Sequence, residues 1–473
     1  MGRTRSFSIR SPTGSPSGWP CSICWREERL ASLLIKGGRV IDPATGTDAL
    51  LDLLVVDGRI AERRPARPGK GASGERGVVP AGTKVLEAAG HWVCPGFVDM
   101  HVHLREPGQE HKESVETGTR AAAAGGFTSI ACMPNTEPWN DGLSVTEYIV
   151  AEARRKGAVN VFPIGCVSKG GRGEELAEIG DMARSGAVAV SDDGQPVANT
   201  YLLRMAMEYT KIFGIPLIDH CEDRDLSAGG AMHEGYVSTM LGLQGIPAAA
   251  EEVAVAADLA VAQLTQGRLH VAHLSTRGSL EKVRQAKREG LRVTCEVTPH
   301  HLVLTDQAVA DSDFDPNTKM NPPLRGEQDR QALIEGLRDG TIDAVASDHA
   351  PHHTDEKLQE FDEAPFGIIG LETSVPLIMD RFVRQGVITP ARFVELMSVN
   401  PARILGLRKG TLAVGADADV TIIDPELERK VDVAQFRSKS RNSPFHGWTL
   451  RGWPVATVVA GQLVHEQRAA ATR

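Results

Sequence analysis

Two histidines separated by one residue, His101 and His103, lie at the end of an apolar stretch that begins at Phe97. Successive side chains of an extended strand point to opposite faces, so these two imidazoles share a face and can bind one ion. Arg105 is in phase with them, where the strand gives way to a loop. Two imidazoles followed by a guanidinium predict a metal site that handles an anionic substrate. Short His-x-His pairs also arise by chance, so this pair alone does not decide the question.

Polar residues also end four further apolar, strand-like stretches. Four histidines and two aspartates at the ends of five predicted strands are much harder to attribute to chance than one pair. They are too many ligands for one tetrahedral zinc ion and enough for two ions bridged by a carboxylate and a solvent oxygen. The predicted metal ligands are His101, His103, Asp193, His220, His273 and Asp348.

Two bridged ions lower the pKa of water and polarise a carbonyl group, which is the chemistry of amide hydrolysis. Asp348 is the predicted catalytic residue, because its carboxylate can relay a proton between the attacking water and the leaving nitrogen. The alternative for Asp348 is a role as a metal ligand only. Adjacent side chains of a strand face opposite ways, so only one of Asp192 and Asp193 can enter the site.

The elements that would position these residues lie between about residues 93 and 405, where strand-like and helix-like stretches alternate eight times. The helix-like stretches include 143–156, 201–213, 251–266 and 328–338. Eight strand–helix units of this size predict an α/β fold with a closed, TIM-like (β/α)8 barrel, whose active site lies at the carboxyl ends of the strands. An open doubly wound sheet is the alternative, but no G-x-G-x-x-G follows the first strand.

Both ends of the chain contain short strand-like stretches joined by glycine and aspartate turns, and we expect them to pair into one small β-sandwich. Residues 61–82 are dense in Arg, Pro and Gly, which predicts a long exposed loop whose role the sequence leaves open. The predicted organisation is a disordered extension over 1–31, a β-sandwich formed by 32–92 and 409–473, and the barrel over 93–408.

Composition narrows the class of protein. The 473 residues include 61 acidic and 52 basic ones, and the net charge of −9 argues against nucleic acid or an anionic membrane as partner. There is no apolar run of about 18 residues, so no transmembrane helix is predicted. Seven cysteines, an odd number, do not suggest a disulfide framework. We therefore expect a soluble, cytoplasmic, globular protein, in which Cys21 and Cys24 of the N-terminal extension form an incidental pair.

Several motifs together resemble the dihydroorotases of the cyclic amidohydrolase superfamily, in particular the class I type with an aspartate-bridged binuclear zinc centre. They span about residues 32–465, in family order. Members catalyse the reversible conversion of N-carbamoyl-L-aspartate and dihydroorotate in pyrimidine (UMP) biosynthesis. The matching segments are 96–108, 133–136, 191–194, 219–222, 271–275, 319–325, 348–352 and 365–367.

The resemblance implies two Zn2+ per chain, with other divalent ions as alternatives. His101 and His103 would bind the first ion and His220 and His273 the second, while Asp193 would bridge them. Asp348 would be both ligand and acid/base. The motif match favours Asp193 over Asp192, which would support a neighbouring loop.

The resemblance also implies a substrate site for a molecule with a free carboxylate and a ring amide. Arg105, Asn135 and His352 would hold the carboxylate, for which a fork-shaped guanidinium is well suited. The alternative for Arg105 is a structural ion pair with Glu106 or a nearby loop. The implied substrate-binding residues are His103, Arg105, Asn135, Asn321, His352, Phe366 and Gly367. His300, His301 and His349 are expected to be structural.

Two other functions remain open. The first is another cyclic amidohydrolase, such as a hydantoinase or allantoinase. Many of these enzymes bridge their metals with a carboxylated lysine on the fourth strand, and this chain has no lysine between Lys169 and Lys211. The second is a non-catalytic structural partner of aspartate transcarbamoylase, although such relatives lose ligands that are all present here. A homodimer and a complex with aspartate transcarbamoylase are the partners to test. Residues 353–365 are polar and are either a mobile flap or an ordinary surface loop.

Overall fold

The computed structural model describes residues 32–66 and 79–467. The predicted extension over 1–31, with Cys21 and Cys24, lies outside the described residues, as does the stretch 67–78 of the predicted loop. The five cysteines within the described ranges are buried and free. In the same part of the chain, none of the helices combines the length and the apolar character needed to cross a bilayer.

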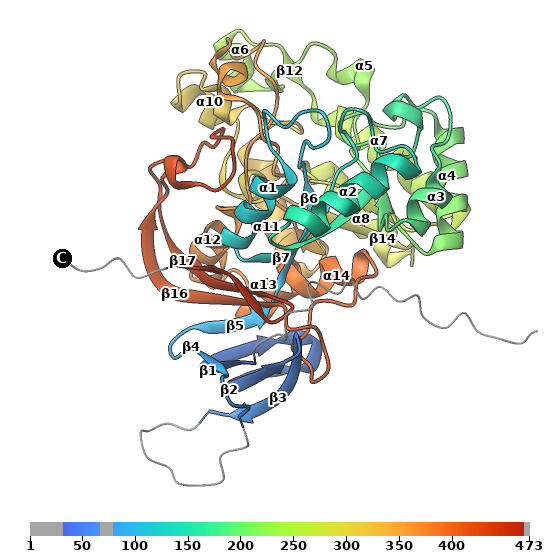
Figure 1. Ribbon diagram of the computed structural model, residues 1–473. Helices are drawn as coiled ribbons and strands as arrows, with labels where there is room; N and C mark the ends of the chain where they lie inside the picture. The colour runs from blue at the N-terminus through green and yellow to red at the C-terminus, as the bar shows by residue number, and fades with distance from the viewer. Residues whose placement is uncertain (1–31, 67–78, 468–473) are drawn as a thin grey trace, which may run out of the picture.

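Eight parallel strands form a barrel at the centre of the molecule (Figure 1). Neighbouring strands pair in chain order, and the last returns to the first through the backbone of His349, whose carbonyl accepts from the His103 N–H at 2.9 Å. This confirms the predicted α/β barrel. The barrel strands are β6 (Phe97–Val102), β7 (Phe127–Cys132), β8 (Asn160–Gly165), β9 (Ala189–Val190), β10 (Leu217–Asp219), β13 (Leu269–Val271), β14 (Val293–Val297) and β15 (Ala344–Val345).

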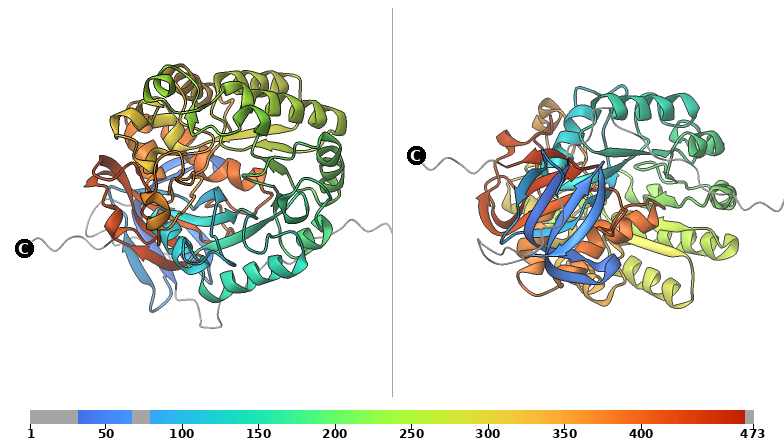
Figure 2. Two further views of the ribbon diagram at one scale, coloured as in Figure 1. Left: turned by 90° about the horizontal axis from the view of Figure 1, so that it is seen from above. Right: turned by 60° about the horizontal axis from the view of Figure 1, so that its bottom comes forward.

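Helices surround these strands when the barrel is seen from above (Figure 2, left). Since helices cover one face and the barrel interior the other, β6 and β7 are buried along their whole length and are apolar throughout most of it. The helices are α1 (Val115–Ala124), α2 (Leu143–Lys156), α3 (Ile179–Arg184), α4 (Thr200–Phe213), α5 (Arg224–Ser227), α6 (Tyr236–Leu241), α7 (Ala248–Thr265), α8 (Arg277–Arg288), α9 (Pro299–Val303), α10 (Gln307–Asp311), α11 (Glu327–Asp339), α12 (Ser374–Ile378), α13 (Pro390–Val394) and α14 (Asn400–Ile404).

Local sequence explains where several of these helices begin. Ser114 caps α1 in a capping box with Thr117, and the Asn199 side chain accepts from the first backbone N–H groups of α4. The range 143–156 predicted for α2 is the observed one. Helix α7 begins three residues earlier than predicted, because the alanines after Pro247 continue the helix toward its N-terminus.

Shorter elements connect the barrel units. A two-stranded sheet follows β10, and single turns of 3-10 helix and two π-helical segments occur elsewhere. These elements are β11 (Met232–His233), β12 (Gly245–Ile246), η1 (Pro43–Thr45), η2 (Lys169–Gly171), η3 (Pro316–Thr318), η4 (Thr354–Leu358), η5 (Met379–Val383), η6 (Glu395–Val399) and η7 (Val433–Gln435).

The two chain ends form one eight-stranded sheet beside the barrel, as Figure 1 shows. Both ends therefore contribute to one β domain, as predicted, and its strands belong to a single sheet where a β-sandwich was expected. Strand β5 joins the two halves, because it pairs with β1 on one side and with β16 on the other. The division at residues 92/93 and 408/409 stays a prediction. The strands are β1 (Leu33–Asp42), β2 (Thr47–Val56), β3 (Arg59–Pro65), β4 (Lys84–Glu87), β5 (Trp92–Pro95), β16 (Val420–Lys430), β17 (Thr449–Val459) and β18 (Gln462–Glu466).

The prediction of a loop from residue 61 onward is wrong for residues 61–65, which belong to β3. These residues pair with β2 despite their charge, with Arg63 opposite Leu53. The Arg63 guanidinium donates to the hydroxyl groups of Thr45 and Thr47. A charged side chain on the outer face of a strand is compatible with a paired backbone, so composition alone misassigned this stretch.

Candidate metal centre and active site

Six buried His and Asp side chains converge at the carboxyl ends of the barrel strands. His101 Nε2 lies 3.4 Å from Asp193 Oδ1 and 3.5 Å from Asp348 Oδ1. His103 Nε2 lies 3.4 Å from Asp193 Oδ2 and 3.3 Å from Asp348 Oδ1. Ligand atoms about 2.0 Å from a tetrahedral ion stand about 3.3 Å from one another. These four side chains therefore have the spacing expected of ligands around one ion.

A second group of donors shares Asp193 with the first. His220 Nδ1 and His273 Nε2 are 2.9 Å apart and lie 3.8 and 3.6 Å from Asp193 Oδ1. Ligand atoms of all three residues lie within 4.8 Å of one another. Asp193 thus faces histidines of both groups, which is the position that a bridging carboxylate needs.

Two buried polar atoms that face the centre, His101 Nε2 and Asp193 Oδ1, have no hydrogen-bond partner among the described residues. Buried polar groups normally form hydrogen bonds, because an unsatisfied one costs about 1–3 kcal/mol. A cation between these atoms would satisfy both, so the donor set fits metal ions.

Two of the candidate ligands are oriented by a partner on the opposite side of the ring. His101 Nδ1 lies 2.8 Å from Glu296 Oε1, and His103 Nδ1 lies 2.8 Å from Asn135 Oδ1. An oxygen that accepts from Nδ1–H leaves the Nε2 lone pair pointing at the centre. Metal-binding histidines characteristically have such a partner. Asn135, predicted to contact substrate, therefore also orients His103.

His220 has the reverse arrangement, with Nδ1 toward the centre and Nε2 3.5 Å from Glu222 Oε2. The Asn321 amide lies 3.3 Å from the same Nε2 and 3.4 Å from the Glu222 carboxylate. Sequence reasoning assigned no role to Glu222 or Glu296. The available signal was an acidic residue inside or directly after an apolar strand, where a charge needs a partner.

Electrostatics favour ionised carboxylates at the centre. Burial would raise the pKa values of Asp193 and Asp348, but the facing His101 outweighs burial and holds both below their usual range. Burial would also lower the pKa of His101, but the two aspartates hold it well above its ordinary value. The aspartates are therefore charged at neutral pH, the form in which they bind metal.

The neighbouring aspartate faces away from the centre, as predicted. Asp192 accepts from the backbone N–H groups of Val167 at 2.8 Å and Ser168 at 3.1 Å, and from the Ser168 hydroxyl. It therefore supports the loop that follows β8. The alternation along the strand directs Asp193 to the opposite side.

Arg105 lies beside this centre, since Asp348 and Asp193 both influence its pKa. Burial lowers that pKa to about 10, so the guanidinium stays charged at neutral pH. Its Nε donates to the Pro351 carbonyl at 3.2 Å. Over residues 32–66 and 79–467 no carboxylate forms an ion pair with the Arg105 guanidinium. The alternative of an ion pair with Glu106 is therefore excluded, and the Glu106 carboxylate accepts from Val115 N–H. The guanidinium is free to hold an anion.

The remaining predicted substrate residues lie on two adjoining segments after β15. Burial lowers the pKa of His352 to about 2, and the neutral ring donates from Nε2 to the Phe366 carbonyl at 2.8 Å. Gly367 N–H already donates to the Lys319 carbonyl at 2.9 Å. A side chain at Gly367 would lie within 3 Å of the His352 ring, and its φ of 150° disfavours other residues.

Three further histidines lie at this end of the barrel and are not candidate metal ligands. His301 bonds Thr298 Oγ1 and the Pro322 carbonyl, as expected of a structural residue. His349 accepts from Gly370 N–H at Nδ1 and faces Glu113 with Nε2. His300 Nε2 is buried and has no partner in the part of the chain that the structure describes.

Comparison with known proteins agrees with this architecture. Residues 90–279 match the family model described as Dihydro-orotase-like. The chain is 56% identical over 436 residues to the dihydroorotase of Pelotomaculum thermopropionicum, which covers 92% of this chain and 99% of the relative. The dihydroorotase of Geobacter metallireducens is 53% identical over 436 residues, covering 92% and 100%. Among solved structures, the L-hydantoinase (dihydropyrimidinase) from Arthrobacter aurescens has a TM-score of 0.79 at 29% identity and covers 93% of this chain and 97% of its own.

The hydantoinase has the same barrel fold with a much less similar sequence. The two bacterial relatives, in contrast, share more than half of their residues with this chain along nearly their whole length. Similarity of that extent is found only between members of one family, and the chain belongs to the dihydroorotase family.

Proposed function

We propose that this protein is a dihydroorotase, a metal-dependent hydrolase that converts the cyclic amide of (S)-dihydroorotate into N-carbamoyl-L-aspartate and catalyses the reverse reaction. One observation carries the proposal: a converging set of His and Asp donors lies beside a half-buried Arg105 without a carboxylate partner in the described ranges. Such a site suits a substrate that joins a reacting amide to a free carboxylate. The relatives' names support the same reaction.

The proposed metal ligands are the six side chains of the centre. His101, His103 and Asp348 would hold one ion, and His220 and His273 the other, with Asp193 shared. When bound, two such ions polarise the amide carbonyl and make water acidic enough to attack it. The proposal of zinc, and of two ions per chain, rests on the donor types and on the family resemblance.

The chain's own residues would orient the substrate and move protons. The Arg105 guanidinium would hold the substrate carboxylate with two charge-assisted hydrogen bonds, while His352 and the Asn135 amide would contact the same group. Asn321 would bind the ring amide together with the backbone at Phe366 and Gly367. Asp348 would accept a proton from the attacking water and deliver it to the leaving nitrogen.

The test is a spectrophotometric assay with dihydroorotate, combined with metal analysis of wild type and Asp348→Ala. We expect wild-type turnover, about two divalent ions per chain, and a loss of about 10²–10⁴-fold in turnover with metal retained in the variant. Asp311→Ala, an exposed aspartate on α10, is the matched control and should retain activity. A wild type that hydrolyses a hydantoin but not dihydroorotate would contradict the proposed substrate. Full activity in Asp348→Ala would contradict the acid/base role.

We also propose a homodimer and a complex with aspartate transcarbamoylase on the basis of the family resemblance, and a cytoplasmic location on the basis of composition. A mobile flap over residues 353–365 is a prediction of the same kind. Size measurement of the purified protein, alone and mixed with the transcarbamoylase, tests the first two.

A further inference from the structure

The segment 437–443 runs between η7 and β17, and four of its polar side chains are buried. Ser438, Ser440, Asn442 and Ser443 are each at most 4% exposed, although the segment has no regular secondary structure. Connecting segments usually lie on the surface, because buried backbone and polar side chains must find partners. The partners of this segment therefore indicate what holds it in the interior.

Asn442 has the most extensive contacts. Its Nδ2 donates to the Ala350 carbonyl at 2.9 Å and to the Gly367 carbonyl at 3.0 Å. Its Oδ1 accepts from His352 N–H at 3.3 Å, and its own carbonyl accepts from Ile369 N–H at 2.9 Å. One buried residue thus joins the segment that contains His352 to the segment that contains Gly367.

Those two segments contain the proposed contacts to the substrate carboxylate and ring amide. They already touch each other directly through the bond from His352 Nε2 to the Phe366 carbonyl. They are also joined by the backbone bond from Ala350 N–H to the Ile368 carbonyl at 3.0 Å. Asn442 adds bonds to both segments from outside them, so the placement of His352 relative to Gly367 depends partly on a residue that belongs to neither segment.

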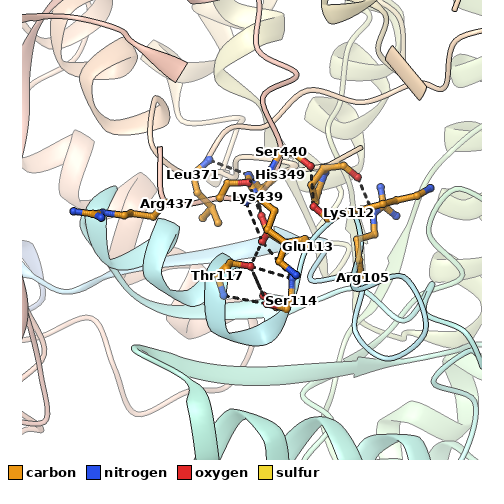
Figure 3. A network of polar contacts seen from close by, with 12 residues as sticks. Arg105, Lys112, Glu113, Ser114, Thr117, His349, Leu371, Arg437, Lys439 and Ser440 are labelled. Atoms are coloured by element: carbon orange, nitrogen blue, oxygen red, sulfur yellow. Dashed lines mark hydrogen bonds and ion pairs between the residues drawn. The ribbon is translucent and has the colours of Figure 1, made fainter. Parts of the chain in front are cut away.

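The 437–443 segment is itself attached to the barrel near Asp348. Figure 3 shows the buried Glu113 carboxylate among its partners: it accepts from the Ser438 hydroxyl and from the N–H groups of Lys439 at 3.4 Å and Ser114 at 3.2 Å. Glu113 also lies 3.4 Å from Nε2 of His349, the residue after Asp348.

A second pair of bonds reinforces this attachment. The Ser440 hydroxyl donates to the Lys112 carbonyl at 2.8 Å, and Lys439 Nζ donates to the Glu110 carbonyl at 2.7 Å. The segment is therefore held to the loop before α1 independently of Asn442.

The chemistry of the contacts explains why this position needs asparagine. An aspartate could not donate to the two carbonyls when ionised, and a leucine would leave the donor and both acceptors unpaired. Glutamine would have to fit an additional methylene group into a fully buried place.

We propose that Asn442 is a positioning residue of the active site, which stabilises the placement of His352 relative to Gly367. This inference rests on the proposed dihydroorotase function. Asn442 touches no metal donor in the described structure, so its effect should be on substrate binding and not on metal content.

The test compares wild type, Asn442→Asp and Ser443→Ala by steady-state kinetics with dihydroorotate, metal analysis and thermal unfolding. Asn442→Asp keeps the size of the side chain but removes the donor to Ala350 and Gly367. We expect KM to rise between about tenfold and a hundredfold, kcat to change much less, and metal content to stay the same. Ser443 is a buried neighbour whose hydroxyl bonds only the backbone N–H of Phe445 in the described structure, so Ser443→Ala should leave KM unchanged.

A folded Asn442→Asp protein with wild-type KM would overturn the inference, and so would loss of metal or an equal fall of kcat at constant KM. If Asn442→Asp is not recovered folded, Asn442→Ser replaces it under the same criteria, because it removes the amide without burying a charge. A wild type without dihydroorotase activity would refute the proposed function, and the inference with it. An active wild type with an unaffected variant would refute the inference alone.

Discussion

Glu296 offers a sharp test of how the metal centre is organised, because it lies behind the candidate ligands. The side chain is fully buried, and Oε1 lies 2.8 Å from His101 Nδ1 and 3.4 Å from the backbone N–H of His273. Oε2 lies 3.3 Å from Nε2 of His270. Although burial would raise the pKa of Glu296, His101 and His270 lower it to about 2. The carboxylate is therefore ionised and holds the proton of His101 on Nδ1, away from the centre.

Two substitutions of Glu296 weaken its hold on the His101 ring to different extents. In Glu296→Gln the amide oxygen can still accept from His101 Nδ1, so the ring keeps its orientation and loses only the charge. In Glu296→Leu the buried Nδ1–H has no acceptor, which costs about 1–3 kcal/mol. Part of that cost is avoided when the ring rotates or changes tautomer, and either change turns the Nε2 lone pair away from Asp193. We expect metal affinity to fall by about tenfold in Glu296→Gln and by about a hundredfold in Glu296→Leu.

The assay is a zinc titration of metal-free protein against a competing chelator, followed by turnover at saturating zinc. Glu289→Gln, on the exposed turn after α8, is the control and should bind zinc as the wild type does. Wild-type zinc affinity in Glu296→Leu would refute the reasoning. Recovery of full turnover at saturating zinc, with weakened affinity, would agree with it.

Two further predictions concern the substrate side of the site. Arg105→Gln should raise KM for dihydroorotate by about 10²–10⁴-fold, because each of two lost bonds to a charged group is worth about 1.5–3 kcal/mol. Steady-state kinetics measures this, and an unchanged KM would exclude Arg105 from substrate binding. Lys357 donates to the carbonyls of Pro316 and Pro365, and burial lowers its pKa to about 7. Between this value and its unfolded pKa of about 10.4 the unfolded chain binds more protons, so the Lys357 contribution to the free energy of unfolding should rise with pH. The difference in thermal midpoint between wild type and Lys357→Met should therefore shift in favour of the wild type from pH 7 to pH 9, and a pH-independent difference would contradict the low pKa.

The candidate metal donors could be predicted from sequence because each one follows a short apolar stretch at the end of a strand. Closure of eight such strands into a barrel then brings them to one place, even though β9 and β15 have only two hydrogen-bonded residues each. Asp192 and Asp193 could also be separated, since adjacent residues of a strand face opposite sides. The alternation of side chains along a strand and the position of polar residues at strand ends were sufficient to predict the candidate metal donors.

Glu296 and Asn442 could not be assigned in the same way, because their partners are distant in the chain. Glu296 contacts His101 from 195 positions away, and Asn442 contacts Ala350 from 92 positions away. Neither contact leaves a local pattern. An isolated acidic residue in an apolar strand and an asparagine in a serine-rich loop indicate only that a polar partner is needed.

The place of β5 between β1 and β16 has a consequence for how the protein is made. A ribosome releases β1 to β5 long before the residues that complete their sheet: Thr421, which bonds Phe97 directly after β5, lies 324 positions further on. Until then the Trp92–Pro95 edge has unpaired backbone groups, and such an edge is prone to pair with another chain. The sheet that contains the first strands to be synthesised can therefore be completed only after all the residues of the barrel have been made.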